Sequence, residues 1–487
     1  MRTKTGIFLG LLIFVMVPSF GQMVSFSLQD VVAMAKEKSI AARQAVTVKE
    51  TRYWEYQTFR SNYKPQLSLN GVLPGYNKTF TQVVQPDGNI RFQPVYNNNS
   101  SLNLSFSQSL AATGGSVFGT TQLQRFDDFQ QKFSLYNAVP FGVGYSQPLF
   151  QFNNLKWDRR IEPLKFKESE QQFIESMEQI AIQACEYYFD LLLAQVNLQI
   201  ASSNVENTRT IRKIANEKFE LGKISRNEIL QLELEQVKAQ KASGIARRDL
   251  EISTLNLKSF IGLPQSQTVT LQLPFSTIAM DIQTQKVLDE ALLNRSDAIA
   301  FVRRMAEARR DVEKAKGDNG LNATLTAQIG FSNSQTTVSS VYQSPKDQQQ
   351  VQLVFSVPIL DWGRSKSRTK TAEANARFTA FAVEQDKQVF HQEIVTQVTL
   401  FDMMKDQLKL TSLADSIASE KHQIAKDRYV LGNLSITDLS IAFQEKDQAK
   451  RDSIAALRDF WLSYYKLRYL SLYDFEKGEK IQYQPQP

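Results

Sequence analysis

Residues 219–236 read FELGKISRNEILQLELEQ, and residues 429–446 read YVLGNLSITDLSIAFQEK. The two stretches place an aromatic residue, a glycine, a serine, an acidic residue and an apolar residue at the same spacing, and the second begins 210 residues after the first. The same offset relates Gln147-Pro148-Leu149-Phe150 to Val357-Pro358-Ile359-Leu360, with no gap in between. This self-similarity predicts an internal structural repeat.

A long helix is predicted before each stretch. In the first copy, apolar or small residues recur at alternating steps of four and three, the 3.5-residue period of helices that coil around each other. These positions are Phe173, Met177, Ile180, Ala184, Tyr187, Leu191, Ala194, Leu198, Ala201, Val205 and Thr208. The second copy, residues 362–428, keeps the spacing less strictly, and Asp415 stands where the first copy has Val205. Each helix is expected to span roughly 65 residues, which is about 100 Å at 1.5 Å per residue.

A helix–turn–helix tip is predicted at the end of each long helix. Gly222 and Gly432 are expected to end the helices, because glycine readily adopts the left-handed conformation that follows a helix. Ser225 and Ser435 then occupy the position of an N-cap residue. They predict second helices over residues 226–260 and 436–474, and an earlier, unbroken helix is expected over residues 28–62.

Strands are predicted before each long helix. Four segments alternate apolar with small polar residues, the pattern of a strand with two unlike faces; these are residues 66–70, 101–108, 322–331 and 352–357. Residues 116–123 and 141–147 alternate more weakly, and whether this extra pair crosses a membrane is left open. Pro148 and Pro358 mark the strand–helix junctions. Four strands per chain predict a twelve-stranded barrel in a trimer.

The first residues have the parts of a signal peptide. Arg2 and Lys4 precede an apolar run over residues 7–17, and Ser19-Phe20-Gly21 offers a small-x-small cleavage site. The mature chain is therefore expected to be exported. Cys185 is the single cysteine, so neither an intrachain disulfide nor a lipid anchor after the cleavage site is expected.

The predicted organisation follows from these boundaries. The segments are the signal peptide 1–21, a first repeat 22–264, a linker 265–284, a second repeat 285–475 and a C-terminal tail 476–487. No later segment has the length of an apolar membrane helix, so any membrane-spanning part is predicted to be a closed barrel. The predicted fold class is a mixed α/β membrane protein, in which a long helical coiled-coil barrel continues a transmembrane β-barrel and trimerisation closes both.

Composition and motifs argue against several functions. The formal net charge of +7 is spread among acidic residues, which is typical of a solvated surface and not of a nucleic-acid-binding arm. His391 and His422 lie within long helices without neighbouring cysteines or suitably spaced carboxylates. No glycine-rich phosphate loop is present. The sequence therefore predicts neither an enzyme nor a metal or cofactor site, and a partner must power any active transport.

The chain resembles the TolC-type outer-membrane efflux proteins over about residues 28–475. The resemblance rests on the paired hairpin strands, the long helix after a Gln-Pro-Leu junction, and the doubled aromatic-x-x-Gly-x-x-Ser-x-x-acid tip. It implies a homotrimeric channel-tunnel in the lipid of the outer membrane, reaching into the periplasm. Such a protein is the passive exit duct of a tripartite efflux or type I secretion system, together with a periplasmic membrane-fusion adaptor and an inner-membrane pump or secretion transporter. Drugs, metals and polypeptides all remain open as cargo.

The resemblance also implies roles at the tip. The adaptor is expected to dock on the two turns, at Leu221, Gly222, Lys223, Ser225, Leu431, Gly432, Asn433 and Ser435. Asp438 matches an acidic position that constricts the pore, Glu228 is its counterpart in the first repeat, and Tyr429 matches a position that keeps the tip shut. Carboxylates around a trimeric pore would favour cations. Capping of the helix that each begins is an alternative explanation for both acids.

Two positions depart from the family pattern. Ile441 stands where a second acid is found, and Leu434 replaces a basic residue that ties the closed state together, so a weaker or a different latch is expected. The remaining alternative is an exported periplasmic coiled-coil structural or adaptor protein without a pore. The alternating strands before both long helices and the duplication of the whole chain favour the channel.

Overall fold

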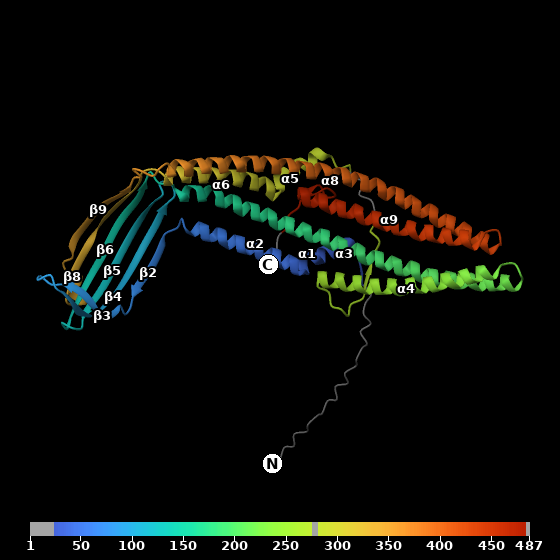
Figure 1. Ribbon diagram of the computed structural model, residues 1–487, viewed down its shortest axis with the longest axis horizontal. Helices are drawn as coiled ribbons and strands as arrows, with labels where there is room; N and C mark the ends of the chain where they lie inside the picture. The colour runs from blue at the N-terminus through green and yellow to red at the C-terminus, as the bar shows by residue number, and fades with distance from the viewer. Residues whose placement is uncertain (1–23, 275–280, 484–487) are drawn as a thin grey trace, which may run out of the picture.

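The computed structural model describes residues 24–274 and 281–483. The molecule is elongated, with a curved sheet at one end and helices that run away from it to a distant tip (Figure 1). The predicted signal peptide, residues 1–21, lies outside the described residues, as does part of the predicted linker.

Two pairs of helices build the long arm of the molecule. Helices α3 (Asn154–Glu220) and α8 (Arg364–Val430) each have 67 residues, and α4 (Arg226–Ile261) and α9 (Ile436–Ser471) each have 36. The predicted long helices and the hairpins at their ends are confirmed. Helix α9 is shorter than predicted, because Leu472 takes a left-handed conformation with φ of 50° and ends it.

The predicted heptad stripe of α3 faces the interior, since none of its members is exposed. Phe173, Tyr187 and Leu191 belong to, or pack against, the large hydrophobic cluster at the middle of the molecule. A second cluster lies at the tip. In α8, Asp415 interrupts the stripe, and its carboxylate pairs with the Nζ atom of Lys450 at 3.1 Å. The charge that breaks the pattern is therefore neutralised by the partner helix.

The helix predicted over residues 28–62 is two helices, α1 (Leu28–Lys38) and α2 (Ile40–Ser61). Ser39 separates them, because its extended backbone (φ −62°, ψ 151°) ends α1. Its hydroxyl then accepts a 3.0 Å hydrogen bond from the N–H of Ala42 and caps α2. The prediction of one unbroken helix was wrong at this residue.

The helices nearest the sheet form a layer. Helices α5 (Thr284–Asn294) and α6 (Ser296–Asp318) precede the second strand region. Helix α2 packs against α3, α3 against α6, and α6 against α8. Helices α2 and α8 are therefore the two edges of this layer. Among the residues described, no helix is both long and apolar enough to cross a membrane.

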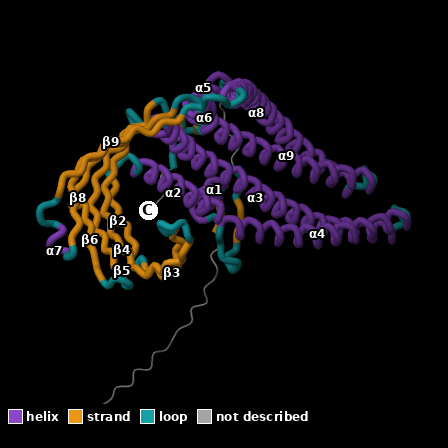
Figure 2. The backbone as a smooth tube through the Cα atoms, turned by 60° about the vertical axis from the view of Figure 1, so that its left-hand side comes forward, coloured by secondary structure: helices purple, strands orange, loops and turns teal. Residues whose placement is uncertain are grey.

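The sheet has seven strands, all antiparallel, in the order β2-β4-β5-β6-β8-β9, with β3 pairing with the first part of β4 (Figure 2). They are β2 (Gln66–Val72), β3 (Tyr76–Val84), β4 (Ile90–Leu110), β5 (Gly115–Asp128), β6 (Phe133–Leu149), β8 (Asn322–Gln335) and β9 (Lys346–Ser356). The short helix α7 (Val338–Val341) joins the last two.

The prediction of four strands was therefore wrong, and so was the twelve-strand count for a trimer. Strands β5 and β6 are full members of the sheet despite their weak alternation. Their pairing shifts register between Thr120 and Gln122, and the pairing of β6 with β8 shifts between Ala138 and Phe141. Such bulges move the following side chains to the other face and blur a period-two pattern.

The two faces of the sheet differ in chemistry. The register aligns Leu67 with Phe106 and Leu69 with Leu104, and the apolar side chains of the other strands continue this face. Members of this apolar face that are exposed include Leu67, Leu69, Leu104, Phe106, Phe141, Ile329, Phe331, Val351, Leu353 and Phe355. The opposite face is mostly polar, although Phe118 and Val354 lie on it, and has hydrogen bonds such as the 2.8 Å contact between the hydroxyls of Ser68 and Ser105.

Two small sheets lie among the helices. Strand β1 (Val24–Phe26) pairs in parallel with β7 (Val269–Leu271), and β10 (Tyr473–Asp474) pairs with β11 (Glu479–Lys480). Strand β7 falls in the predicted linker 265–284, so this segment is tied to the start of the described chain. Cys185 is buried and free, and burial raises the pKa of its thiol well above the ordinary value.

Candidate functional site

The two turns at the tip have the same backbone geometry. Gly222 and Gly432 take left-handed conformations with φ of +68° and +84°. In both turns the residue after the glycine donates its N–H to the carbonyl five residues back, at 2.9 Å. This is the Schellman motif, and the positive φ is why glycine stands at both positions. The sequence prediction that these glycines end the long helices is confirmed.

Serine and an acid cap the helix after each turn. The hydroxyl of Ser225 accepts from the N–H of Glu228 at 3.4 Å, and the Glu228 carboxylate accepts from the N–H of Ser225 at 2.7 Å. In the second turn, Asp438 N–H donates to the Ser435 hydroxyl at 3.1 Å, and that hydroxyl donates to the Asp438 carboxylate at 2.7 Å. Both acids therefore stabilise the start of their own helix, as the capping explanation requires. Their pore role stays a prediction.

The outer surface of both turns is open to solvent. The residues predicted to dock an adaptor are exposed, namely Leu221, Gly222, Lys223, Ser225, Leu431, Gly432, Asn433 and Ser435. Leu221 and Leu431 are 69% and 75% exposed, and the space that a Cβ atom would take at either glycine is empty to a distance of 4 Å. Two apolar side chains thus project into water at the most distant end of the molecule.

The inner side of the turns packs against a small apolar core, which we call the tip cluster. Its buried members are Ile211, Ala215, Ile229, Leu232, Ala425, Tyr429, Ile436, Leu439 and Ala442, from all four long helices. Ile224 and Leu434, which precede the two capping serines, pack against it from the turns. Leu434 therefore holds the tip by apolar contact at the position where the family pattern has a basic residue.

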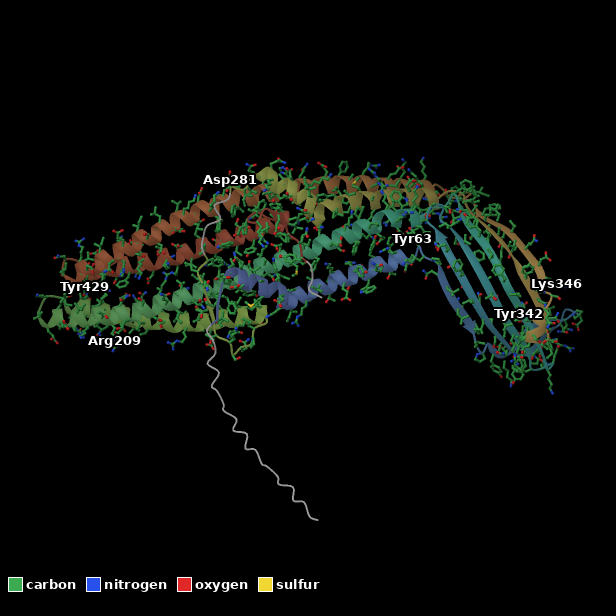
Figure 3. All side chains as sticks on the ribbon, turned by 180° about the vertical axis from the view of Figure 1, so that it is seen from behind. Tyr63, Arg209, Asp281, Tyr342, Lys346 and Tyr429 are labelled. Atoms are coloured by element: carbon green, nitrogen blue, oxygen red, sulfur yellow. The ribbon has the colours of Figure 1, made fainter. Side chains whose placement is uncertain are left out.

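One lysine crosses between the two hairpins. The Nζ atom of Lys218 donates a 2.8 Å hydrogen bond to the carbonyl oxygen of Tyr429 and lies 4.6 Å from the centre of the Tyr429 ring. Figure 3 places Tyr429 at the end of the helical arm. Tyr429 is 5% exposed, and burial, followed by the negative charge of Glu228, raises the pKa of its phenol.

The two halves of the tip are not equivalent. Phe219, the counterpart of Tyr429, is 40% exposed, whereas Tyr429 is inside the tip cluster. Arg428, the counterpart of Lys218, donates to the carbonyl of Asn433 in its own turn at 3.5 Å instead of crossing to the other hairpin. Lys218 thus makes a contact that its counterpart does not make.

Further from the tip, polar side chains also connect the two hairpins. The Nδ2 atom of Asn204 on α3 donates to the carboxylate of Asp447 on α9 at 2.5 Å. His422 is buried nearby, and burial, followed by the charges of Lys446 and Lys426, lowers the pKa of its imidazole. In the part of the chain that the structure describes, no group of His, Cys, Asp and Glu could hold a metal ion.

The remaining predicted residues differ in their surroundings. Glu228 is half-buried beside Tyr429, and Asp438 is exposed. Ile441 is 47% exposed. Pro148 lies within β6, opposite Thr324 of β8, and Pro358 follows β9 and is exposed. Both prolines stand at the strand–helix junctions, as predicted.

Sequence reasoning missed the cross-hairpin role of Lys218 and the packing of Ile224 and Leu434. The repeat contained the signal for the last two, because both occupy the same apolar position before the capping serine. No sequence signal singles out Lys218, since its partner is a backbone carbonyl on a helix far away in the chain.

Comparison with known proteins agrees with this geometry. The family model described as "Outer membrane efflux protein" matches residues 102–263 and 287–470, which is more than half of the chain. The pyoverdine export outer membrane protein OpmQ of Pseudomonas putida is 24% identical over 187 residues, which cover 38% of this chain and 39% of that relative's length.

Solved structures share the fold. The outer-membrane channel OprN has a TM-score of 0.66 at 16% identity, covering 91% of this chain and 89% of that one. The CmeC channel of Campylobacter jejuni gives 0.66 at 16% identity over 94% and 87%. The open state of the MtrE channel of Neisseria gonorrhoeae gives 0.63 at 16% over 94% and 91%. The chain belongs to the outer membrane efflux protein family and is located in the outer membrane.

Proposed function

We propose that this protein is the passive exit duct of a tripartite efflux or type I secretion system. The observation that carries the proposal is the chemistry of the sheet. One face presents a continuous set of exposed apolar side chains, such as Leu353 at 55% and Phe355 at 67% exposure, while the other is mostly polar. A barrel wall with lipid outside and water inside has this division.

Trimerisation would close the wall, because the chain has two free edges. Strands β2 and β9 end the sheet, and all of their residues are exposed. Helices α2 and α8 end the helical layer in the same order. An unpaired edge favours pairing with another strand. Three copies joined edge to edge would give a transmembrane barrel that is continued by a helical barrel into the periplasm. Residues 22–264 and 285–475 would be the two repeats of each copy.

The tip is the proposed meeting point with the partners. Exposed Leu221 and Leu431 offer apolar contacts for a periplasmic adaptor, and the adaptor would connect the duct to an inner-membrane pump or secretion transporter. Glu228 and Asp438 would line the constriction inside the trimer. The transporter would select the cargo, and the pyoverdine of the OpmQ relative is one candidate cargo class.

Cysteine labelling in cells tests the proposed orientation. Lys346 lies at the far end of the sheet (Figure 3), and Asn227 lies beside the first turn of the tip. A membrane-impermeant maleimide should label a Lys346→Cys variant in intact cells. It should label an Asn227→Cys variant after the outer membrane has been permeabilised, and not before. Wild-type protein is the control, because Cys185 is buried. Labelling of both variants only after permeabilisation would support the periplasmic coiled-coil alternative.

A further inference from the structure

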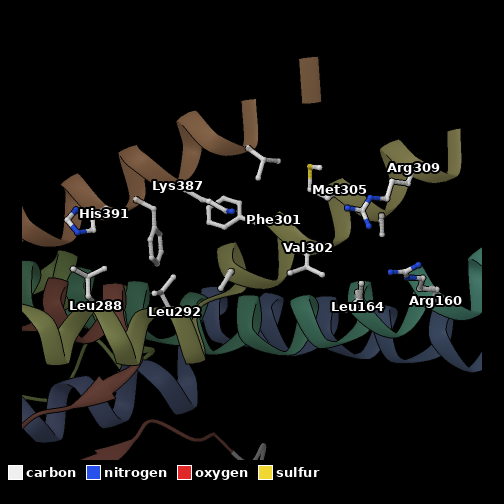
Figure 4. A pocket seen from close by; sticks show the side chains of 14 residues that line it. Arg160, Leu164, Leu288, Leu292, Phe301, Val302, Met305, Arg309, Lys387 and His391 are labelled. Carbon is white, nitrogen blue, oxygen red and sulfur yellow. The ribbon is translucent and has the colours of Figure 1, made fainter. Parts of the chain in front are cut away.

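A groove lies between α3, α5, α6 and α8 (Figure 4). Its volume is about 470 Å³. Phe301 of α6 and Phe390 of α8 are 8% and 7% exposed, and their rings meet edge to face, with centroids 6.1 Å apart at 89°. These packed rings give the groove a preformed apolar base, as small-molecule sites usually have.

Apolar side chains on the walls of the groove are exposed to water. Val302 of α6 is 58% exposed and Leu292 of α5 is 51% exposed. Leu164 and Met305 extend the apolar wall toward the sheet end of the helices. A concentration of uncovered apolar surface in a concave place is typical of a binding site.

The charged groups around the groove are all basic. Arg160 of α3 and Arg309 of α6 line one end, and Lys387 and His391 of α8 lie toward the other (Figure 4). No carboxylate lines the groove. Arg160 also lies 5.8 Å from the ring of Trp157. The groove therefore combines an apolar interior with a positive potential.

These cations differ from their neighbours. Arg303, Arg304 and Arg310 of α6 are paired with Glu168, Asp386 and Asp311. Within residues 24–274 and 281–483, Arg160, Arg309 and Lys387 form no such ion pair. The positive charges of these three side chains are therefore available to bind an anion.

A second copy of the chain would not fill this groove. The side of α8 that faces the groove carries Val383 and Phe390, which are 3% and 7% exposed. The free edge of α8 is a different side, with Phe381 and Val389 at 74% and 56% exposure. Edge-to-edge assembly would cover the free edge and leave the groove open.

We propose that the groove binds a single-chain anionic amphiphile, with a long-chain fatty acid as the model ligand. The carboxylate would lie between Arg160 and Arg309, because two guanidinium groups offer planar pairs of donors that match carboxylate geometry. The acyl chain would lie along Val302, Met305 and Phe390. A volume toward the small end of the range for ligand pockets suits one chain. The site is independent of the exit-duct function.

Photolabelling of the full-length protein in a non-ionic maltoside detergent tests the site. The probe is palmitic acid with a diazirine in its tail, and the matched neutral probe is its methyl ester. We expect the acid to label peptides containing Val302, Met305 or Phe390, and unlabelled palmitate to compete. Exposed pairs of charges contribute modestly, so the double variant Arg160→Gln, Arg309→Gln should lower labelling by the acid about tenfold.

Two controls make the result decisive. Arg159 and Lys314 are exposed basic residues on α3 and α6 that do not line the groove, so the double variant Arg159→Gln, Lys314→Gln should label as wild type. Val302→Trp should block labelling by filling the groove, with the assembled mass of the protein unchanged. Equal labelling by acid and ester, unchanged labelling in the Arg160 and Arg309 variant, or labelled peptides elsewhere would overturn the proposal.

Discussion

Lys218 and Tyr429 connect the two helical hairpins at the tip. The ammonium group of Lys218 donates a 2.8 Å hydrogen bond to the carbonyl of Tyr429 and lies 4.6 Å from the centre of its ring. The two residues are in α3 and α8, so the contact joins the first half of the chain to the second. The rest of this junction is the apolar tip cluster at the tip itself and polar contacts such as Asn204–Asp447 further from it. We infer that the tip of this chain depends more on packing than on ion pairs.

Replacing Lys218 should loosen the tip without unfolding the chain. Lys218→Met keeps much of the aliphatic side chain but loses the hydrogen bond, for a cost of about 1 kcal/mol. Amide hydrogen exchange in the last turn of α8 should then be about fivefold faster, since 1.4 kcal/mol corresponds to a factor of ten. Lys223→Met is the matched control, because Lys223 is exposed in the turn that follows α3. Equal hydrogen-exchange rates in the two variants would show that Lys218 does not stabilise the tip.

A basic residue at Leu434 should weaken the tip of this protein. The half-buried Leu434 packs against the tip cluster, so Leu434→Arg would bring a charge against apolar side chains and cost about 1–3 kcal/mol. Limited proteolysis should cut the turn at residues 431–435 faster than in wild type. Leu434→Met keeps the volume and should leave the rate nearly unchanged. Slower cutting of the arginine variant would mean that a basic residue latches this tip too.

The acidic residues after the two turns should set ion selectivity. Glu228→Gln combined with Asp438→Asn removes two carboxylates per chain while leaving acceptor oxygens for the caps. We expect the reversal potential in asymmetric potassium chloride to move toward zero, because the cation-favouring field would be reduced. Glu220→Gln, at the end of α3, is the control for a general change of charge. An unchanged reversal potential in the double variant would leave capping as the whole role of both acids.

Much of the helical arm could be predicted from sequence, because its determinants are local. Each signal involves residues that are close together in the sequence. These signals are the 3.5-residue period of α3, the glycines at 222 and 432 and the capping serines. The break at Ser39 was missed because serine is also tolerated inside a helix, although it is favoured as an N-cap residue. The full strand number was missed because bulges near Thr120 and Ala138 interrupt the alternation.

The tip was predicted less completely than the arm, because its key contacts join distant segments. The Lys218–Tyr429 hydrogen bond uses a backbone carbonyl, which any residue supplies. The burial of Tyr429 and the exposure of Phe219 follow from how two similar hairpins pack, and the repeat pattern treats these residues as equal. The sequence repeat identifies Phe219 and Tyr429 as matching residues, and the packing of the hairpins determines which of the two is buried.

A buried carboxylate at the middle of the molecule should control acid stability. Glu178 is fully buried and pairs with the Nζ atom of Lys36 at 2.7 Å and the Nε atom of Arg468 at 3.1 Å, and it accepts from the hydroxyl of Tyr483 at 2.5 Å. Burial alone would raise the pKa of Glu178, but the charges of Lys36 and Arg468 outweigh it and hold the pKa at about 2, below the usual 4.5.

The sign of the pH effect follows from this lowered pKa. The contribution of Glu178 to stability is complete above pH 4.5 and is lost as the pH falls toward 2. Glu178→Gln should lower the free energy of unfolding at neutral pH by about 3–5 kcal/mol, because Lys36 loses its counterion and Arg468 keeps only Asp474. It should also flatten the acid limb of the stability profile, measured by thermal unfolding in detergent.

Glu162→Gln is the matched control for this prediction. Glu162 pairs with Lys165 at 2.7 Å on a partly exposed surface of α3, so its loss should cost less than about 1 kcal/mol. A Glu178→Gln variant as stable as this control, with the same acid limb as wild type, would show that the buried network does not stabilise the fold.

Copies of this chain are proposed to enclose a water-filled duct, and single-channel conductance in planar bilayers tests this most directly. Purified protein whose detergent-corrected mass is that of a trimer of the 55.5 kDa chain, or of its shorter exported form, should be added at low concentration. We predict discrete conductance steps, closed for most of the time, with a preference for cations and a larger open fraction in the Lys218→Met variant. The absence of current from both the wild type and the Lys218→Met variant, after either protein has inserted into the bilayer as a trimer or as a monomer, would contradict the claim.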